Sequence, residues 1–411
     1  MFTQFTTLLA EAGPHFEGYV YPNESGSHPL WGVLIVLYPY ITGLVAGAFI
    51  MASLVRVFRV KALEPVYRLS LLTALAFMLC ATLPLLFHLG HPFRSYQIMI
   101  TPHLTSPMAI FGFVYLWYLM AVLLLELWLD YRENFVQWGS TVKGPQGFLY
   151  RTLTVGVTDL SPQAVKLDHK MSWIISIVGI PSAFLLHGYV GFIFGSIKAN
   201  PWWGNAIMPI IFILSAIVSG IALCVFVYIF LSKVRGRAVD MRCLDVMGMF
   251  LFYGLVIDAT VEALDWVHRA YSAEEGFHVM EYMAQQHLFF TLSIAQLLLG
   301  TLVPLLALGV IQIARKRIPD KVRWSVYTIC SILILVGVLA MRWNVVMGGQ
   351  FYSKSLRGVM SYKFEFAGAE GWLMGGLLLA LPFIILTVLI KLFLSERLPV
   401  AGHDPHPLEN D

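Results

Sequence analysis

Nine long apolar stretches make up most of this sequence, and the ionisable residues inside them lie mainly toward one common end. Runs without any charged residue include 29–55, 199–232, 288–314 and 371–390. Each is long enough to cross a bilayer, because a spanning helix needs about 20 apolar residues. An ionisable side chain at mid-membrane costs roughly 2.5–3.5 kcal/mol, so such residues are rare and usually functional. The sequence predicts a polytopic membrane protein with a polar site in one half of the bilayer.

The composition supports the bilayer as the solvent of this chain. Charged residues make up 12% of the sequence, against about 25% in a soluble domain, while 58% of the residues are hydrophobic. A soluble fold of this length could not bury so much apolar surface. The net charge of +3 is too small to indicate a nucleic-acid partner.

We therefore expect an all-α fold whose helices alternate in direction across the membrane. The predicted helices span residues 30–56, 66–89, 106–129, 170–197, 205–232, 242–268, 286–314, 323–344 and 370–394. With these bounds, 20 of the 27 Lys and Arg residues fall on one side and seven on the other. The positive-inside rule then places the C-terminus in the cytoplasm and the N-terminus outside, which for a bacterial protein is the periplasm. We expect no cleavable signal peptide, because residues 1–27 lack the basic start and apolar core of one.

The cysteines and histidines argue against a redox centre held by this chain alone. The four cysteines (Cys80, Cys224, Cys243 and Cys330) are scattered, without a CxxC or CxxCH motif, so neither an iron–sulfur cluster nor a c-type haem is expected. The histidine spacings, 88/91 and 169/187, do not suit a pair of b-type haem ligands, and no metal site is expected.

Histidine and arginine gather where the second predicted helix ends. His88, His91 and Arg94 recur every three residues, so they share a face if the helical turn continues. His187, about 18 residues beyond His169, lies roughly 27 Å along its own helix, in the same half of the membrane. Arg342 near the end of the eighth helix belongs to this half as well.

Acidic residues form a stripe on the sixth predicted helix. Asp258, Glu262, Asp265 and Arg269 follow at offsets of four, seven and eleven, so they share one inward face. Two carboxylates one turn apart repel each other unless a proton or cation lies between them, which favours proton exchange. Asp265 and Arg269 also fit an ion pair without a further role.

Three kinds of chemistry use such a set of side chains: haem binding, ion or proton transport through the carboxylates alone, and quinone chemistry. A quinone takes up two electrons and two protons. It needs hydrogen-bond donors at its carbonyls and titratable groups that relay protons. The histidines and arginines at one level, with carboxylates deeper, match this need best. The haem alternative is disfavoured by the histidine spacing.

One segment resembles a known family of membrane subunits. The run Gly179-Ile180-Pro181-Ser182-Ala183-Phe184-Leu185-Leu186-His187-Gly188-Tyr189 is similar to the NrfD/PsrC signature, as are Pro201-Trp202-Trp203 and the runs 88–94 and 342–350. The similarity covers nearly the whole chain from residue 30. Length and organisation are closest to larger members, such as the membrane subunits of the Qrc menaquinone reductase and of alternative complex III.

The resemblance implies two four-helix bundles, built from helices two to five and six to nine, with the first helix outside them. It also implies that the chain has no redox cofactor of its own and binds menaquinone or another quinone. Electrons would be exchanged with a periplasmic ferredoxin-like iron–sulfur subunit, and molybdopterin-type and multihaem cytochrome c subunits are further expected partners. The expected domains are residues 1–29 (periplasmic segment), 30–60 (extra helix), 61–234 (first bundle), 235–396 (second bundle) and 397–411 (cytoplasmic tail).

We accordingly expect the quinone-binding subunit of a respiratory oxidoreductase of the bacterial inner membrane, with quinone reduction favoured over quinol oxidation. The expected quinone-binding residues are His88, His91, Arg94, His187, Tyr189 and Arg342. The expected proton-transfer residues are His187, Asp258, Glu262, Asp265 and, in the cytoplasmic half, Glu126. The alternative is a proton-translocating module that is driven by conformational change and does not contact quinone.

Overall fold

The computed structural model is entirely helical in the part of the chain that it describes, which is residues 31–101, 105–272, 276–351, 362, 364–368 and 370–394. The first elements are α2 (Val33–Arg56), η1 (Lys61–Leu63), α3 (Glu64–Ala81), α4 (Leu83–His88), η2 (Pro92–Arg94), α5 (Gln97–Ile100), α6 (Pro107–Leu116), η3 (Trp117–Leu124), α7 (Leu125–Thr141) and α8 (Pro145–Leu153). The others are α9 (Pro162–Gly195), α10 (Met208–Val234), α11 (Met241–Tyr271), α12 (Phe277–Gln286), η4 (Phe289–Leu302), α13 (Val303–Ala314), η5 (Arg315–Arg317), α14 (Asp320–Gln350) and α15 (Trp372–Phe393).

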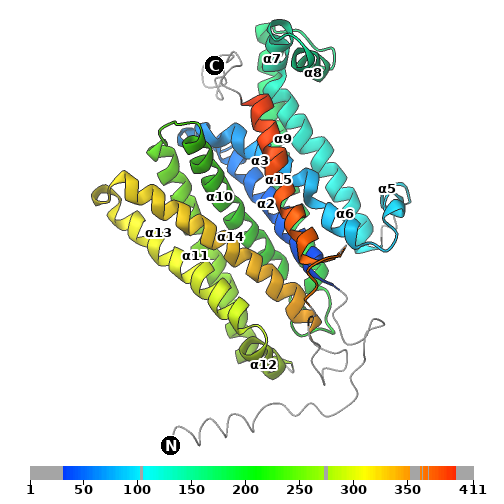
Figure 1. The fold of residues 1–411 in the computed structure, drawn as a ribbon, viewed down its shortest axis with the longest axis vertical. Coiled ribbons are helices and arrows are strands. Elements are labelled where there is room, and N and C mark those ends of the chain that lie inside the picture. Colours follow the sequence, from blue (N-terminus) through cyan, green and yellow to red (C-terminus); the bar gives the residue numbers. More distant parts are fainter. Residues whose placement is uncertain are drawn as a thin grey trace, which may run out of the picture.

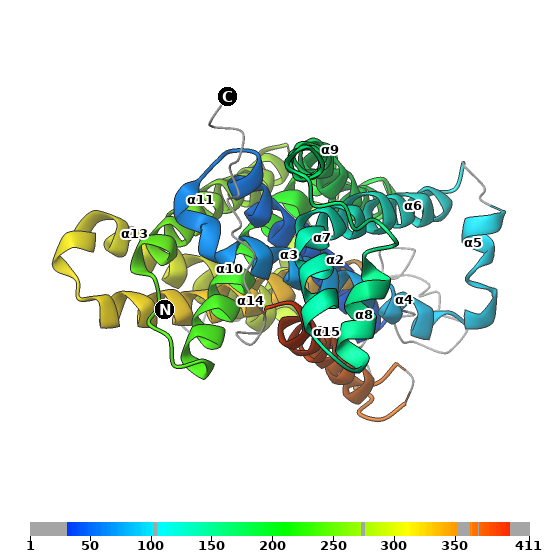
Figure 2. The same ribbon diagram turned by 90° about the horizontal axis from the view of Figure 1, so that it is seen from above.

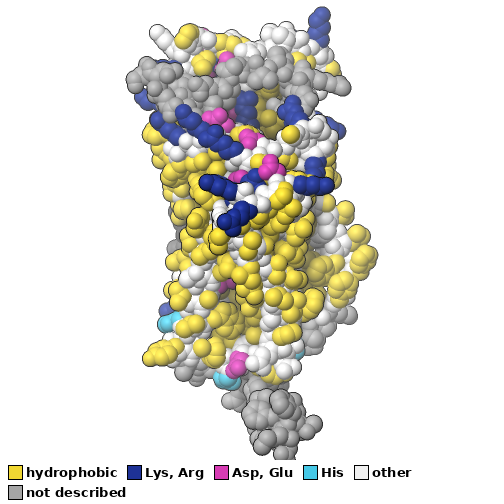
Figure 3. Space-filling view, turned by 90° about the vertical axis from the view of Figure 1, so that its left-hand side faces the viewer, with side chains coloured by type: hydrophobic (Ala, Val, Ile, Leu, Met, Phe, Trp, Pro, Cys, Tyr) yellow, Lys and Arg dark blue, Asp and Glu magenta, His cyan; other side chains and the backbone are white. Residues whose placement is uncertain are grey.

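Nine helical stretches in these described residues are long and apolar enough to cross a membrane, which confirms the predicted number. The long helices run side by side along one common direction (Figure 1). On the face shown in Figure 3, Lys and Arg side chains gather at the upper end, above a broad apolar belt. We call this the basic end of the molecule. The arrangement is that expected of helices whose sides face lipid and whose ends face water.

Helix α2 lies in the middle of the molecule, contrary to the prediction that it lies outside two bundles. It packs against α3, α9, α10 and α14, and nearly all of its residues are buried. Small residues make this position possible: a Cβ added at Gly47 would lie 2.2 Å from the carbonyl oxygen of Ala216, so α2 and α10 touch backbone to backbone. In a membrane such close contact replaces the hydrophobic effect as the force that joins helices.

The predicted division into two four-helix bundles is not confirmed. The last helix, α15, packs against α3 and α2, although the prediction grouped it with α11, α13 and α14. Helix α10 contacts α2, α9, α11 and α14, so it joins the two halves of the molecule (Figure 2). The separate domain boundaries remain predictions.

Several helices extend beyond their predicted bounds. The predicted cytoplasmic loop 130–169 contains the end of α7, all of α8 and the start of α9. Tyr131, Phe135, Trp138 and Tyr150 stack together there and hold α8 against α7 at the basic end. At the other end, α14 continues to Gln350. The predicted segments 1–29 and 397–411 lie outside the described residues, as do residues 352–361, 363 and 369 of the connection between the last two predicted helices.

Two membrane-spanning helices contain π-helical segments, η3 and η4. Such segments interrupt the regular hydrogen-bond ladder of an α-helix and often occur at functional sites. Segment η4 approaches α14 closely, since a Cβ added at Gly300 would lie 2.4 Å from the Cα of Gly337. This contact brings Gln296 of η4 close to Asn344 of α14, and the two side chains are hydrogen-bonded.

Candidate functional site

A large apolar pocket lies at the end of the molecule opposite the basic end. Its volume is about 830 Å³, and it is enclosed by α2, α4, α5, α6 and α9. Trp31, Tyr38, Tyr115 and Phe194 supply aromatic walls. This volume and lining fit a small-molecule site, which is concave, mostly apolar and roughly 300–1,000 Å³ in size.

The same pocket is lined by His88, His91 and Arg94. These three residues do not share a helical face, contrary to the expectation, because α4 ends at His88 and the backbone at Leu89 is extended. Gly90 and Pro92 explain the break, since neither favours a helix interior. The three polar side chains nevertheless lie at one apolar cavity, as a site for a mostly apolar ligand with polar carbonyls requires.

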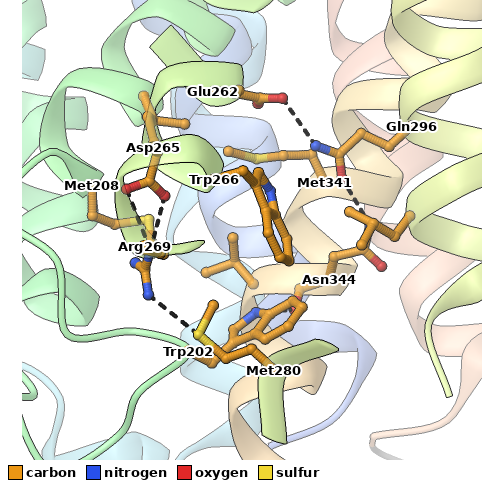
Figure 4. A pocket seen from close by; sticks show the side chains of 13 residues that line it. Trp202, Met208, Glu262, Asp265, Trp266, Arg269, Met280, Gln296, Met341 and Asn344 are labelled. Carbon is orange, nitrogen blue, oxygen red and sulfur yellow. Dashed lines mark hydrogen bonds and ion pairs between the residues drawn. The ribbon is translucent and has the colours of Figure 1, made fainter. Parts of the chain in front are cut away.

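A second, smaller cavity lies between α11, η4 and α14. Its volume is about 70 Å³, and Glu262, Asp265, Gln296 and Asn344 line it together with Trp202 and several methionines (Figure 4). The carboxylate stripe of α11 therefore faces inward, as predicted, with Asp258 and Asp265 buried. A polar cavity of this size has room for water with polar partners.

Amide side chains connect this cavity to α14. Nε2 of Gln296 donates to a carboxylate oxygen of Glu262 at 3.1 Å, and Nδ2 of Asn344 donates to Oε1 of Gln296 at 2.8 Å. The hydroxyl of Thr291 completes the chain by donating to Oδ1 of Asn344 at 2.6 Å. Sequence reasoning did not single out Gln296. Its signal was an amide near the start of the uncharged run 288–314, which contains one other amide, Gln312.

Asp265 and Arg269 form an ion pair at the end of this cavity, with 3.1 Å between Oδ2 and Nε. Asn205 also donates to Asp265, and Arg269 donates to the carbonyl oxygen of Pro201 at 2.7 Å. The indole of Trp202 donates to the carbonyl oxygen of Asn344 at 2.8 Å. The segment before α10 therefore closes the acidic cavity on this side, and Asp265 has a clear structural function.

His187 and Arg342 meet in the interior between the two cavities. Both are completely buried, and 3.0 Å separates Nε2 of His187 from Nη2 of Arg342. Arg342 also donates to the Ser215 hydroxyl at 2.7 Å, and its guanidinium lies over the Phe212 ring, 4.0 Å from the centroid. The other ring nitrogen of His187 faces the Thr42 hydroxyl at 3.5 Å.

Neither His187 nor Arg342 lines either cavity, although each has neighbours that do. Phe194 lines the apolar pocket and packs against Phe212, which stacks on His187. On the other side, Arg342 donates to the sulfur of Met341, which lines the acidic cavity. Asp258 and Glu262 are within electrostatic reach of Arg342. The pair thus connects the two cavities through one layer of side chains on each side.

Asp258 and Glu126 each have one buried carboxylate oxygen without a hydrogen-bond partner in the described part of the chain. Glu126 lies on the first turn of α7, toward the basic end, where Ser176 donates to its other oxygen at 2.6 Å. Glu126 lines neither cavity. Tyr189 of α9 stacks on Phe192 and lines neither cavity.

The metal-ligating residue types form no cluster in the described ranges. No group of three or more His, Cys, Asp or Glu side chains there could hold a metal ion. Cys80, Cys224, Cys243 and Cys330 are all buried and unpaired by disulfides.

Fold and site together define a polytopic helical membrane protein with an apolar pocket and an acidic cavity on either side of a buried His–Arg pair. Residues 22–353 match the family described as polysulphide reductase, NrfD, and the chain belongs to this family.

The relatives of this chain include proteins that are named as subunits of oxidoreductases. One of them belongs to the selenate reductase of Mesobacillus selenatarsenatis and is 29% identical over 333 residues, which are 78% of this chain and 74% of the relative. The integral membrane subunit of the Hdr-like menaquinol oxidoreductase of Archaeoglobus fulgidus is 22% identical over 403 residues, which are 94% of this chain and 91% of the relative. Protein NrfD of Escherichia coli is 26% identical over 211 residues, which are 51% of this chain and 59% of the relative.

Proposed function

We propose that this protein is the quinone-binding membrane subunit of a respiratory oxidoreductase complex and that the quinone occupies the large apolar pocket. The observation on which the proposal rests is the coincidence of His88, His91 and Arg94 with an apolar cavity of about 830 Å³. An isoprenoid quinone has an apolar tail and ring with two carbonyl acceptors. The pocket offers aromatic walls for the ring and hydrogen-bond donors for the carbonyls.

The side chains of the pocket bind and orient the quinone, and the buried groups behind it supply or remove protons. Arg94 and His91 or His88 hold the carbonyl oxygens. Proton transfer to the interior passes from the pocket toward Asp258 and Glu262, and His187 with Arg342 connects the two regions. Because Arg342 only donates hydrogen bonds, it holds Nε2 of His187 as an acceptor and sets the tautomer of that ring.

Electrons come from outside this chain. The relatives include parts of a selenate reductase and of a menaquinol oxidoreductase, which supports a redox partner for this chain. In our proposal this partner docks at the pocket end of the molecule. We propose an iron–sulfur subunit in this place, on the periplasmic side of a bacterial inner membrane, and menaquinone as the quinone. Quinone reduction is the proposed direction. Glu126 is then the proton carrier nearest the cytoplasmic, basic end.

Filling the pocket tests this function. Ile193 lines the pocket from α9, and Leu185 is exposed on the same helix. In the purified complex, Ile193→Trp should abolish quinone-dependent turnover and the thermal stabilisation by a quinone-site inhibitor. Leu185→Trp, with the same added bulk, should leave both unchanged. An Ile193→Trp complex with wild-type turnover and inhibitor binding would contradict the proposal.

One observation favours a second candidate function, a proton-translocating module without quinone contact. The acidic cavity and its amide chain lie on α11, η4 and α14, separate from the apolar pocket. This candidate predicts that an intact complex contains no quinone and that Ile193→Trp is silent. In that case Asp258→Asn should still stop proton movement.

A further inference from the structure

An acidic residue that sequence reasoning did not identify lies at the edge of the apolar pocket. Oε1 of Glu370 is 3.0 Å from Nδ1 of His88, and the two side chains are 41% and 22% exposed. Glu370 belongs to the segment that precedes α15, and His88 is the last residue of α4. Residues 282 positions apart in the sequence therefore form an ion pair at the mouth of a cavity.

Only one ring nitrogen of His88 contacts Glu370. Nδ1 faces Glu370, and Nε2 has no hydrogen-bond partner among the described residues. His88 itself lines the pocket. A carboxylate that accepts from Nδ1–H fixes the tautomer and the orientation of an imidazole, so that Nε2 is the nitrogen left for proton exchange. The side chain of Glu370 is also exposed enough to contact water.

We propose that Glu370 positions His88, so that Nε2 of His88 exchanges a proton with an oxygen of the quinone in the apolar pocket. This inference rests on the proposed function. In the reduction direction, the Nε2–H bond of the imidazolium breaks and an O–H bond forms on the quinone oxygen. The imidazole is left neutral, with its Nδ1–H bond intact and donating to Glu370, and a proton from the water at the mouth re-forms the Nε2–H bond. The step supplies one of the two protons that accompany two electrons from the redox partner.

Few other charged groups among the described residues lie near the pair. His91 and Arg94 come from the same connection as His88, while Tyr38 of α2 and Tyr115 of α6 face the pocket. Tyr362 lies within electrostatic reach of Glu370, and burial raises the pKa of its phenol, so it stays neutral. Gly32 at the start of α2 lies against Glu370, since a Cβ added there would be 3.9 Å from its carboxylate. Glu370 is the acidic group in contact with His88.

Two substitutions separate the charge of Glu370 from its hydrogen bond. In Glu370→Gln the amide oxygen still accepts from Nδ1–H, but the negative charge that favours imidazolium is lost. The pH limb of kcat/KM that disappears in His88→Gln should therefore move to lower pH. The shift to lower pH is expected whether the complex reduces quinone or oxidises quinol. Glu370→Ala should show the same shift and, in addition, a several-fold lower kcat.

Glu365→Gln is the matched control, because Glu365 is an exposed acid on the same segment and its side chain does not contact His88. Its pH profile should equal that of the wild type. Glu370→Asp keeps the charge and should keep the position of the limb. In a His88→Gln background, Glu370→Gln should produce no further shift. A limb that stays in place in Glu370→Gln, or a shift that persists without His88, would overturn the inference.

The measurement is made on the complete complex, from about pH 5.5 to 8.5, with a soluble quinone analogue and with inhibitor binding followed by thermal shift. Inhibitor binding distinguishes a failure of the proposed quinone-binding function from a failure of the proposed role of Glu370. If no inhibitor binds to the wild type, the proposed function fails. If the inhibitor binds and Ile193→Trp blocks it, while Glu370→Gln leaves the pH profile unchanged, only the role of Glu370 is refuted.

Discussion

Arg342 donates a hydrogen bond of 3.0 Å to Nε2 of His187 in the completely buried centre of the molecule. Since a guanidinium has no acceptor, this contact requires a lone pair on Nε2 and places any ring proton on Nδ1, toward Thr42. Proton exchange at Nε2 therefore requires that the contact with Arg342 open. His187 is better placed to orient Arg342 toward the carboxylates than to meet a ligand directly.

Loss of the buried guanidinium should destabilise the protein through the acids that it faces. Arg342→Met removes the hydrogen bond to Ser215 and leaves Asp258 without its nearby cation. We expect a loss of about 3–5 kcal/mol, seen as a lower midpoint of thermal unfolding in detergent. Asp258→Asn in the same chain should restore part of the loss. Arg317→Met, at an exposed position of the basic end, is the control. Equal unfolding midpoints for wild type and Arg342→Met would show that the buried guanidinium does not compensate the charge of Asp258.

Removing the charge of the acidic cavity should affect turnover rather than quinone binding. Glu262→Gln and Asp258→Asn keep the size of each side chain but cannot carry a proton. Loss of a general acid or base typically lowers a rate by about 10²–10⁴-fold. We expect at least a tenfold decrease in kcat, with inhibitor affinity unchanged. Glu281→Gln on the exposed face of α12 should be silent. Weaker inhibitor binding with unchanged kcat would place the quinone near these acids instead.

The sequence predicts which segments are helical and which polar residues face inward better than it predicts which residues meet in space. The positions of Asp258, Glu262 and Asp265 on one inward face follow from helical periodicity and the cost of charge in lipid. That His88, His91 and Arg94 line one pocket is not a periodic feature, because α4 ends at His88. The ion pair with Glu370 joins segments far apart in the sequence, so no local pattern predicts it.

The small residues of α2 favour its central position, whereas the family resemblance places this helix outside two bundles. A helix that is apolar on all sides and contains Gly43, Gly47 and Ala48 is suited to a fully buried position. Membrane-facing and buried faces differ little in hydrophobicity, so hydropathy alone could not distinguish a central helix from a peripheral one.

The close contact of α2 with α10 makes Gly47 intolerant of any side chain. Gly47→Ala forces apart two backbones, since its Cβ would lie 2.2 Å from the Ala216 oxygen. Overpacking of this kind costs about 1–3 kcal/mol, and we expect a clearly lower unfolding midpoint. Gly376→Ala is the matched control, because a Cβ on Gly376 of α15 meets nothing within 4 Å. A stable Gly47→Ala variant would contradict the central position of α2.

Arg94 should determine affinity for the quinone. Its side chain lines the pocket, and Arg94→Gln removes a charged donor for a carbonyl oxygen. A hydrogen bond with one charged partner contributes about 1.5–3 kcal/mol, so we expect KM and the inhibitor dissociation constant to rise roughly tenfold or more. The kcat should change little. Lys198→Gln, an exposed charge beyond the end of α9, controls for docking of the partner. A fall in kcat alone would show that Arg94 does not bind the quinone.

The position of the quinone itself is the central claim, and photolabelling tests it most directly. A photoreactive quinone analogue is added to the complete complex, and labelled peptides are identified by mass spectrometry. The account predicts labels in segments 85–99 and 190–194, which contain many of the residues that line the apolar pocket, and their loss in Ile193→Trp. Labels on the acidic cavity residues of α11 and α14, with none in those two segments, would contradict it.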